Sequence, residues 1–443
     1  MAHYHEFFNG KRVTVLGLGL LGRGVGDAAF IASQGATVTV TDRKSEDELR
    51  ESIGRLADHD ITFHLGGHRE SDFTDTDMVI KAAGVRLDSS EITVARKAGV
   101  PVYMSTALAA KFASEMGVNV IGITGTRGKS TVAHLIHHAL VNAGKRSHLG
   151  GNVRGVSTLA MLPDLQKGDF LVLELDSWQL QGFGDLEISP QVAVFTNLQT
   201  DHQNYYPDMR AYFADKANIF KYQKKGDSLI ATPELAERIR EIGAGEEAYR
   251  VHIEIPAPAE WKLEMPGEHN RLNAALAAAA LEVIGLTSDE TRSGLESFGG
   301  VEGRLQFMRE VGGVKIYNDN NATTPQATIA ALQALSAGQG SIGEKNIILI
   351  LGGADKGLDI DPLLEEIEKA CKDIVLLKGT GSDRIFQKKA TYQYDDLDMA
   401  LQAALGRAQA GDILLFSPAF ASFGMFKNEY DRNDRFVKLI RDL

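Results

Sequence analysis

Three times along the chain, a short run of β-branched and other apolar residues ends in glycines and is followed by a helical pattern. The runs read "RVTVLGLGLLGRG" at residues 12–24, "VNVIGITGTRGKS" at residues 118–130 and "NIILILGGADKG" at residues 346–357. Continuous runs of Val, Ile and Leu are typical of parallel strands buried on both faces, with helices as the crossovers. The sequence therefore predicts an α/β fold of mainly parallel sheets with flanking helices.

The three units also predict three domains. A chain of 443 residues is too long for one hydrophobic core. The first unit continues through strands near residues 36–42, 77–84 and 99–104 and then reaches residues 105–117, which we expect to be irregular. Glycines at residues 299–303 break a helical pattern before the third unit. We predict domains at residues 1–107, 108–300 and 301–443.

Charge and cysteine content exclude several classes of protein. Lys and Arg total 47 against 59 Asp and Glu, so the formal net charge is −12, which disfavours a broad nucleic-acid or anionic-membrane surface. The sole cysteine, Cys371, excludes an intrachain disulfide and suits a reducing compartment. No apolar run is long enough to span a bilayer. We expect a cytoplasmic protein with no membrane insertion and no nucleic-acid partner.

The first glycine-rich segment has the spacing of a dinucleotide-type fingerprint. Gly17, Gly19 and Gly22 follow a predicted strand and open a helix, and Asp42 ends the next strand. Such glycines let the backbone approach a diphosphate at a helix N-terminus. The pattern does not distinguish NAD from UDP, and the glycines could also serve only a tight strand–helix turn.

The second segment, "GITGTRGKST" at residues 122–131, is typical of a phosphate-binding loop, although Ile123 stands where a standard loop has its first glycine. Lys129 can reach terminal phosphates, Ser130 can bind Mg²⁺, and the glycines leave backbone donors free. This segment predicts a nucleoside triphosphate site.

Further polar residues stand where ligand groups collect in open α/β sheets. Glu174 ends a predicted strand, and His202 lies just past another. On residue type alone, Glu174 could be a surface carboxylate and Lys216 a solvated helix lysine. Asn270 and Asn273 share a helix face and could hold a nucleotide or be core amides.

The motifs come in an order that resembles the Mur ligase family over nearly the whole chain. They are "GITGTRGKST", "LELDSWQL", "TDHQNYYPDMRAYFADKANIF", "GEHNRLNAA", "GRLQF", "YNDNNATTP", "LGGADKG" and "LLFSPAFASFGMFKNEYDRNDRF". This family uses the shortened loop for ATP and the first domain for a UDP-sugar. The resemblance implies a Rossmann-like UDP-sugar domain, a P-loop ATPase domain and a Rossmann-like C-terminal domain that binds glutamate.

The resemblance also implies a reaction of peptidoglycan precursor synthesis. ATP phosphorylates the carboxylate of UDP-N-acetylmuramoyl-L-alanine, and the amine of glutamate then attacks the acyl phosphate. By motif match, Ser130 and Glu174 hold one Mg²⁺. His202 holds a second Mg²⁺ together with Lys216, which carries a CO₂-derived carbamate.

The same match implies the remaining ligand contacts. Those to ATP come from Gly125, Thr126, Arg127, Gly128, Lys129, Ser130, Thr131, Asn270, Asn273, Arg304 and Asp319. Those to the UDP-sugar come from Gly19, Leu20, Leu21, Gly22, Asp42, Arg43 and Asn152. Those to glutamate come from Thr323, Lys356 and Ser422.

Three residues depart from the family pattern. Asp176 and Asn321 replace a usual serine and lysine, and Glu429 stands where a phenylalanine often closes over glutamate. We predict D-glutamate as the substrate, with Arg127 as a candidate to replace the missing lysine charge. L-glutamate stays open, because "ATTP" and "SFGMF" are similar to a branch that adds it.

Two other classes of function were weighed. A nicotinamide-dependent oxidoreductase would rest only on the first glycine segment and Asp42, and it leaves Lys129, Glu174 and Lys216 unexplained. A nucleotide sensor without catalysis would keep the phosphate loop but release no phosphate.

Overall fold

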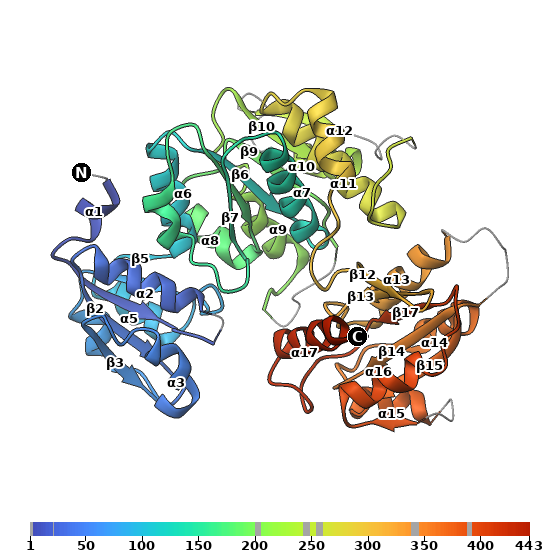
Figure 1. Ribbon diagram of the computed structural model, residues 1–443. Coiled ribbons are helices and arrows are strands. Elements are labelled where there is room, and N and C mark those ends of the chain that lie inside the picture. The colour runs from blue at the N-terminus through green and yellow to red at the C-terminus, as the bar shows by residue number, and fades with distance from the viewer. Residues whose placement is uncertain are drawn as a thin grey trace. The chain divides into compact units, whose positions relative to one another are not determined.

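The computed structural model describes residues 3–20, 22–199, 205–241, 249–253, 260–337, 345–387 and 392–443. Their strands form three separate sheets (Figure 1). The chain divides into two compact units, one of Met1–Ile255 with Asn273–Leu295 and the other of Pro256–Leu272 with Glu296–Leu443. The predicted α/β class is confirmed, whereas the domain boundaries at residues 107 and 300 stay predictions.

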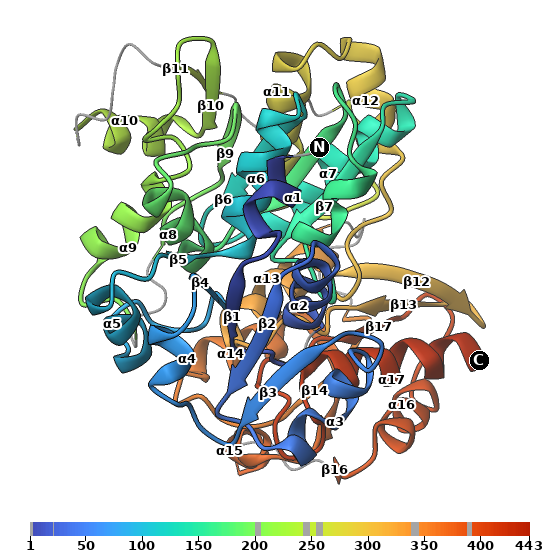
Figure 2. The ribbon, with the colours of Figure 1, turned by 90° about the vertical axis from the view of Figure 1, so that its left-hand side faces the viewer.

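The first sheet has the order β3-β2-β1-β4-β5, and all its strands are parallel (Figure 2). Its strands are β1 (Arg12–Leu16), β2 (Thr37–Asp42), β3 (Ile61–Leu65), β4 (Met78–Lys81) and β5 (Val102–Tyr103). Its helices are α1 (His3–Phe8), α2 (Arg23–Ser33), α3 (Glu46–Gly54), α4 (Ser71–Thr74) and α5 (Ser90–Lys97). The strand order reverses direction at β1, so a crevice opens beyond its carboxyl end.

The second sheet has the order β11-β10-β9-β6-β8-β7 and is also parallel. Its strands are β6 (Asn119–Thr124), β7 (Ser147–Gly151), β8 (Phe170–Glu174), β9 (Val192–Phe195), β10 (Asp227–Ala231) and β11 (Tyr249–Ile253). The helices are α6 (Ser105–Glu115), α7 (Lys129–Asn142), the 3₁₀ helix η1 (Leu159–Asp164), α8 (Ser177–Asp185), α9 (Met209–Ala217), α10 (Pro233–Glu241), α11 (Glu268–Val283) and α12 (Ser288–Glu296).

The third sheet is mixed, with the order β12-β13-β17-β14-β15-β16. Its strands are β12 (Gln306–Val311), β13 (Val314–Asn318), β14 (Ile347–Gly352), β15 (Cys371–Leu377), β16 (Gln393–Tyr394) and β17 (Ile413–Phe416). Its helices are α13 (Pro325–Ala337), α14 (Asp361–Ala370), α15 (Thr380–Phe386), α16 (Leu397–Leu405) and α17 (Glu429–Asp442). Only the edge pair β12–β13 is antiparallel among the pairs of this sheet that the structure describes.

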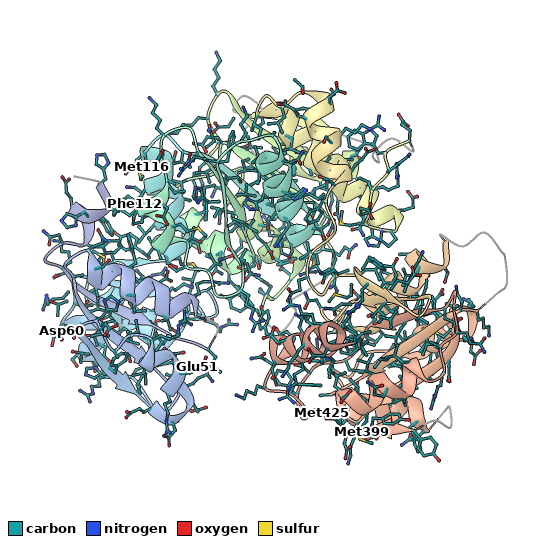
Figure 3. The ribbon with its side chains drawn as sticks, in the orientation of Figure 1. Glu51, Asp60, Phe112, Met116, Met399 and Met425 are labelled. Carbon is teal, nitrogen blue, oxygen red and sulfur yellow. The ribbon has the colours of Figure 1, made fainter. Side chains whose placement is uncertain are left out.

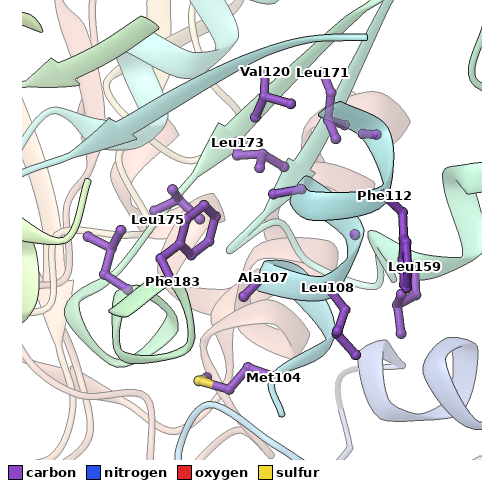
Figure 4. Packing of buried hydrophobic residues seen from close by; sticks show 14 of the residues in the cluster. Met104, Ala107, Leu108, Phe112, Val120, Leu159, Leu171, Leu173, Leu175 and Phe183 are labelled. Atoms are coloured by element: carbon purple, nitrogen blue, oxygen red, sulfur yellow. The ribbon is translucent and has the colours of Figure 1, made fainter. Parts of the chain in front are cut away.

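The prediction of an irregular segment at residues 105–117 is wrong. Ser105–Glu115 form helix α6, whose side chains pack against the second sheet (Figure 4). Its Ala, Leu and Phe residues are good helix formers or apolar, and Ala107, Leu108 and Phe112 lie in the core. Burial of this apolar face stabilises the helix more than its Ser-Thr start disfavours it.

Some of the charged side chains lie on the outside of these layers, whereas others are buried. Glu51 and Asp60 project outward beyond the first sheet (Figure 3). Among the described residues, none of the helices combines the length and apolar character needed to cross a lipid bilayer.

The core of the third sheet yields a stability prediction. Phe436 of α17 is fully buried and stacks on Phe416 of β17, with 4.3 Å between ring centroids. We expect Phe436→Ala to cost about 3–5 kcal/mol, because it leaves a cavity of aromatic size. Calorimetry should show the unfolding transition lowered by several degrees, whereas Phe386→Ala, at an exposed ring, should change it little. Equal effects of the two substitutions would contradict this.

Candidate active site

The loop between β6 and α7 needs glycine at two positions. Gly125 and Gly128 have φ of +143° and +82°, which residues with side chains rarely adopt. A Cβ on Gly125 would collide with Thr196 Oγ1, and one on Gly128 with Asn273 Oδ1. The sequence motif therefore forms a tight loop at the amino end of a helix, and Asn273 packs directly against it. Backbone donors and the helix dipole at such an end attract anions.

Two lysine amines converge on this loop. Lys129, the first residue of α7, donates from Nζ to the carbonyls of Gly125 at 3.0 Å and Thr126 at 3.1 Å. Lys216 of α9 donates to the same Gly125 carbonyl at 2.9 Å and to Thr124 Oγ1 at 3.4 Å. Two ammonium groups that share one carbonyl repel each other, so this arrangement favours an anion close to both.

Lys216 is not a solvated helix lysine. Its side chain is 1% exposed, and Nζ lies 4.8 Å from the centroid of the Tyr212 ring. The preceding residue, Asp215, accepts hydrogen bonds from Gln181 Nε2 at 2.7 Å and Tyr206 Oη at 2.9 Å. Burial of an ammonium group is costly unless an opposite charge or strong acceptors compensate. Lys216 therefore occupies a buried position among polar groups rather than a surface position.

Glu174 ends β8 beside the loop strand. It is 4% exposed, and its backbone is in register with Ile123 of β6. Its Oε1 accepts a hydrogen bond from Asn152 Nδ2 at 3.4 Å, and its carbonyl accepts one from the Asn152 N–H at 2.7 Å. Ser130, near the start of α7, is also buried. A carboxylate and a hydroxyl at adjacent strand and helix ends are suitable donors for Mg²⁺.

Two predicted site residues, His202 and Leu21, lie outside the described residues. Their predicted contacts with metal and UDP-sugar stay predictions.

The glycine segment after β1 is held by Asp42. Gly17, Gly19 and Gly22 have φ of +92°, +66° and +83°. Asp42 Oδ2 accepts hydrogen bonds from the N–H groups of Leu18 at 2.9 Å and Gly19 at 3.2 Å. The carboxylate at the end of β2 therefore fixes the shape of the loop after β1, a role that the sequence did not indicate.

Two cavities flank this loop. One of about 590 Å³ is lined by Asp42 and Arg43, among other residues, and the other, of about 240 Å³, lies toward α2 and α6. Arg43 pairs with Glu91 at 2.8 Å. Leu20, at the tip of the loop, is exposed. The two cavities share Gly17 and Gly84, so an elongated ligand could run across the glycines from one to the other.

In the C-terminal unit, the predicted glutamate residues follow neighbouring strands. Thr323 comes after β13, Ser422 after β17 and Lys356 after β14, and these strands are adjacent in the sheet. Lys356 Nζ donates to Thr323 Oγ1 at 3.0 Å, and Ser422 is buried. The structure thus places all three beyond the carboxyl edge of one sheet, with Lys356 and Thr323 in contact.

Asp319 begins the same loop and is buried. Its Oδ2 accepts a hydrogen bond from Ser417 Oγ at 2.7 Å, and its Oδ1 accepts one from the Leu305 N–H at 3.0 Å. Burial raises the pKa of Asp319 to about 7, although both hydrogen bonds oppose the shift. Arg304, predicted beside it as a nucleotide contact, has an exposed side chain.

Asn321 takes part in a network of amides around a buried arginine. Its Nδ2 donates to the Glu302 carbonyl at 3.3 Å, and its Oδ1 accepts from Asn320 Nδ2 at 3.2 Å. Arg432, fully buried, donates from Nε to Asn320 Oδ1 at 2.8 Å and from Nη1 to the Phe420 carbonyl at 3.3 Å. The network joins the loops that carry Thr323 and Ser422. Sequence reasoning missed Arg432, since an arginine on a charged helix gives no sign of burial.

Asp176 has a local structural role. Its Oδ1 accepts a hydrogen bond from the Gln179 N–H at 2.7 Å, and Gln179 Oε1 accepts one from the Asp176 N–H at 3.2 Å. This is a capping box at the start of α8. Serine and aspartate are both strong N-cap residues, so the departure from the family serine preserves the helix start.

The other predicted positions are as follows. Arg127 has an exposed side chain, and its N–H donates to Asn197 Oδ1 at 2.9 Å. Asn270 is buried, and its Nδ2 donates to the Pro266 carbonyl at 2.8 Å. Thr131 is buried within α7. Glu429 begins α17, and its carbonyl accepts a hydrogen bond from Asn320 at 2.9 Å.

Comparison with known proteins gives consistent matches along the chain. Family profiles match the MurD-like N-terminal domain of Mur ligases at residues 11–104, the Mur ligase middle domain at residues 123–261 and the Mur ligase glutamate ligase domain at residues 303–420. The solved structure of UDP-N-acetylmuramate-alanine ligase from Thermotoga maritima has a similar fold, with a TM-score of 0.61 at 19% identity over 98% of this chain and 99% of that one.

Two curated relatives are both named UDP-N-acetylmuramoylalanine–D-glutamate ligase. The protein from Roseiflexus sp. (strain RS-1) is 34% identical over 97% of this chain and 98% of its own length. The protein from Koribacter versatilis is 32% identical over 98% of each chain. Profile matches in all three parts and identity above 30% over nearly the full length lead to one conclusion: the chain belongs to the Mur ligase family.

Proposed function

We propose that this protein is an ATP-dependent ligase that joins D-glutamate to UDP-N-acetylmuramoyl-L-alanine in peptidoglycan precursor synthesis. The names of its relatives support this reaction, and so does the motif order along the chain. The observation that carries the proposal is the pair of amines, Lys129 and Lys216, on the carbonyl of Gly125.

The phosphate loop fits ATP. Gly125 and Gly128 keep its floor free of side chains, and Lys129 lies over it within reach of a terminal phosphate. Asn273 packs against Gly128 and is placed to contact the nucleotide. A lysine at this position stabilises the charge of a phosphoryl group in transfer.

Ser130 and Glu174, the described donors next to the loop, suit Mg²⁺, and the motif match adds a second ion. We assign Ser130 and Glu174 to the first ion and His202 and a carbamate on Lys216 to the second. When bound, these ions neutralise charge on the phosphates and the acyl group. Addition of CO₂ would convert the buried Lys216 amine into an anion, which relieves its repulsion with Lys129 and supplies oxygen donors for a hard cation.

The cavities of the first sheet suit the UDP-sugar. We assign the uridine end to the larger cavity, which Asp42 and Arg43 line. We assign the diphosphate to the glycine loop between the two cavities. Asn152 contacts Glu174, so it is placed to hold the muramoyl-alanine arm close to the phosphate loop.

The reaction then follows in two steps. An oxygen of the alanine carboxylate attacks the terminal phosphorus of ATP, and ADP leaves while Lys129 stabilises the charge on the phosphoryl group. The glutamate nitrogen next attacks the acyl carbon, loses a proton, and expels phosphate. We assign Thr323, Lys356 and Ser422 to the carboxylates of the incoming glutamate.

A second candidate substrate is L-glutamate. Asn321, at the position of the usual lysine, is held in the amide network around Arg432 and brings no charge to the site. Arg127 remains our candidate for the compensating charge. The cytoplasmic location stays a prediction based on the sole cysteine, Cys371, which is buried.

Lys129→Ala tests the phosphate loop. We expect a loss of activity of roughly three orders of magnitude or more, because the substitution removes the charge that stabilises the transferred phosphoryl group. Phosphate release with UDP-N-acetylmuramoyl-L-alanine and D-glutamate is the measurement. Lys145→Ala, at an exposed lysine of the same unit, serves as the control. Near-native turnover of Lys129→Ala would rule out the phosphate-loop assignment.

Lys216→Ala tests the carbamate. We expect an almost inactive enzyme that regains activity when short carboxylates such as acetate occupy the vacated anionic position. Lys129→Ala should show no such rescue, since it lacks a cation rather than an anion. Normal turnover of Lys216→Ala in CO₂-depleted buffer would contradict the carbamate assignment.

The choice of glutamate isomer is tested by initial rates of ATP-dependent ligation with D- and L-glutamate at equal concentration. We expect faster turnover with D-glutamate, because the other isomer would present its amine to the acyl carbon in the wrong orientation. Faster turnover with L-glutamate would overturn the D-specific assignment. An unchanged rate for Arg127→Ala would remove Arg127 as the compensating charge.

A further inference from the structure

Two guanidinium groups flank the glycine loop of the first sheet. Arg23 is the first residue of α2 and directly follows Gly22. Arg55, just after α3, lies next to Gly22 on the side where a side chain would stand. A Cβ built on Gly22 would lie 2.9 Å from Arg55 Nη1. The Cα of Gly155 lies 3.6 Å from the same point. Both arginines therefore lie beside the point where the loop enters the helix.

Neither guanidinium is neutralised. Within the described part of the chain, Arg23 and Arg55 form no ion pair with Asp or Glu. Arg23 Nη2 donates to the neutral Asn152 Oδ1 at 3.1 Å, and its Nε–H is buried without a hydrogen-bond partner among those residues. A buried N–H donor without a partner is unfavourable, so its presence beside a cavity points to a ligand acceptor.

The cavity beside Arg23 is positively charged. The charged residues that line its volume of about 240 Å³ are Arg23, Lys81 and Asp27. Lys81 is 2% exposed, and its Nζ donates to the carbonyl of Val85 at 3.0 Å. Asp27 accepts a hydrogen bond from Ser157 Oγ at 2.6 Å, and burial raises its pKa, whereas the charge of Arg23 opposes the shift. Two basic side chains and one acidic side chain line this small cavity, so basic groups predominate there and favour an anion.

The backbone adds to this preference. Helix α2 has 11 residues, and its N-cap Gly22 makes no side-chain hydrogen bond to the first turn. The free N–H groups and the helix dipole at that end attract negative charge. A guanidinium presents paired donors that match two phosphate oxygens.

We propose that Arg23 and Arg55 clasp the diphosphate of the UDP-sugar from two sides of Gly22. Arg23 provides its unpaired Nε–H, and Arg55 reaches the phosphates across the bare glycine. The inference rests on the proposed function and adds two binding residues to it.

The position of Arg23 also connects the two nucleotide sites of this unit. Arg23 donates to Asn152 Oδ1, and Asn152 Nδ2 donates to Glu174 Oε1 at 3.4 Å. Arg23 therefore orients an amide that contacts the carboxylate beside the phosphate loop. A diphosphate held by Arg23 would leave the muramoyl-alanine arm directed along this chain of hydrogen bonds.

The test uses a series of ligands that differ only in the number of phosphate groups. Calorimetric titration of the full chain with uridine, UMP and UDP measures how much each phosphate adds to affinity. In Arg23→Met and in Arg55→Met we expect UDP affinity to fall about 10- to 100-fold, the range for loss of a charged hydrogen bond, with uridine affinity unchanged. Arg23→Lys keeps the charge but loses the paired donors, so its UDP affinity should be intermediate.

The matched control is Arg50→Met in α3. Arg50 is exposed and pairs with Asp47, so all three affinities should be unchanged. Unchanged UDP affinity in Arg23→Met and Arg55→Met would overturn the inference and leave the proposed function intact. An equal fall for uridine and UDP would also overturn it, because the arginines would then shape the cavity rather than contact phosphate. No binding of UDP by the unmodified protein would overturn the proposed function as well.

Discussion

The carbonyl of Gly125 is the point on which the candidate site depends. It accepts hydrogen bonds from Lys129 and Lys216, which arrive from different helices, and it is accessible to both because its own residue has no side chain. The position of the loop follows from β6, whose neighbours β8 and β9 bring Glu174 and Thr196 to the same edge. Two ammonium groups at one carbonyl repel each other, and an anion close to both would reduce this repulsion.

In the first sheet, different residues hold the glycine loop and supply positive charge beside it. Its glycine loop is held by Asp42, whose carboxylate accepts two loop N–H groups, whereas the charge offered to a ligand comes from Arg23 and Arg55. In nicotinamide-binding proteins the corresponding acid contacts a ribose. Here the acid braces the loop, and a separate pair of arginines is free for phosphate.

In the C-terminal unit, neutral amide side chains hold a buried arginine in place. Asn320 and Asn321 surround the buried Arg432, and the network ties together the loops of Thr323 and Ser422. Burial lowers the pKa of Arg432 to about 10, so the side chain stays charged near neutral pH although its partners are uncharged. A buried arginine with such partners is costly to disturb, so its hydrogen bonds stabilise the loops that carry Thr323 and Ser422. Asn321 therefore belongs to the scaffold of the site rather than to its charge.

The sequence by itself determined the α/β class, the two glycine loops and the residue types of the phosphate site. These are local properties, because apolar runs, positive-φ glycines and a following lysine act over a few neighbouring residues. It did not indicate that residues 105–115 form a buried helix, since packing on the second sheet decides that. Only the tertiary structure revealed the burial of Lys216 and Arg432, the loop contacts of Asp42 and the unpaired donor of Arg23. Each of these depends on contacts between strands and helices that are tens to more than a hundred residues apart in the sequence. Such contacts produce no periodic pattern in the sequence.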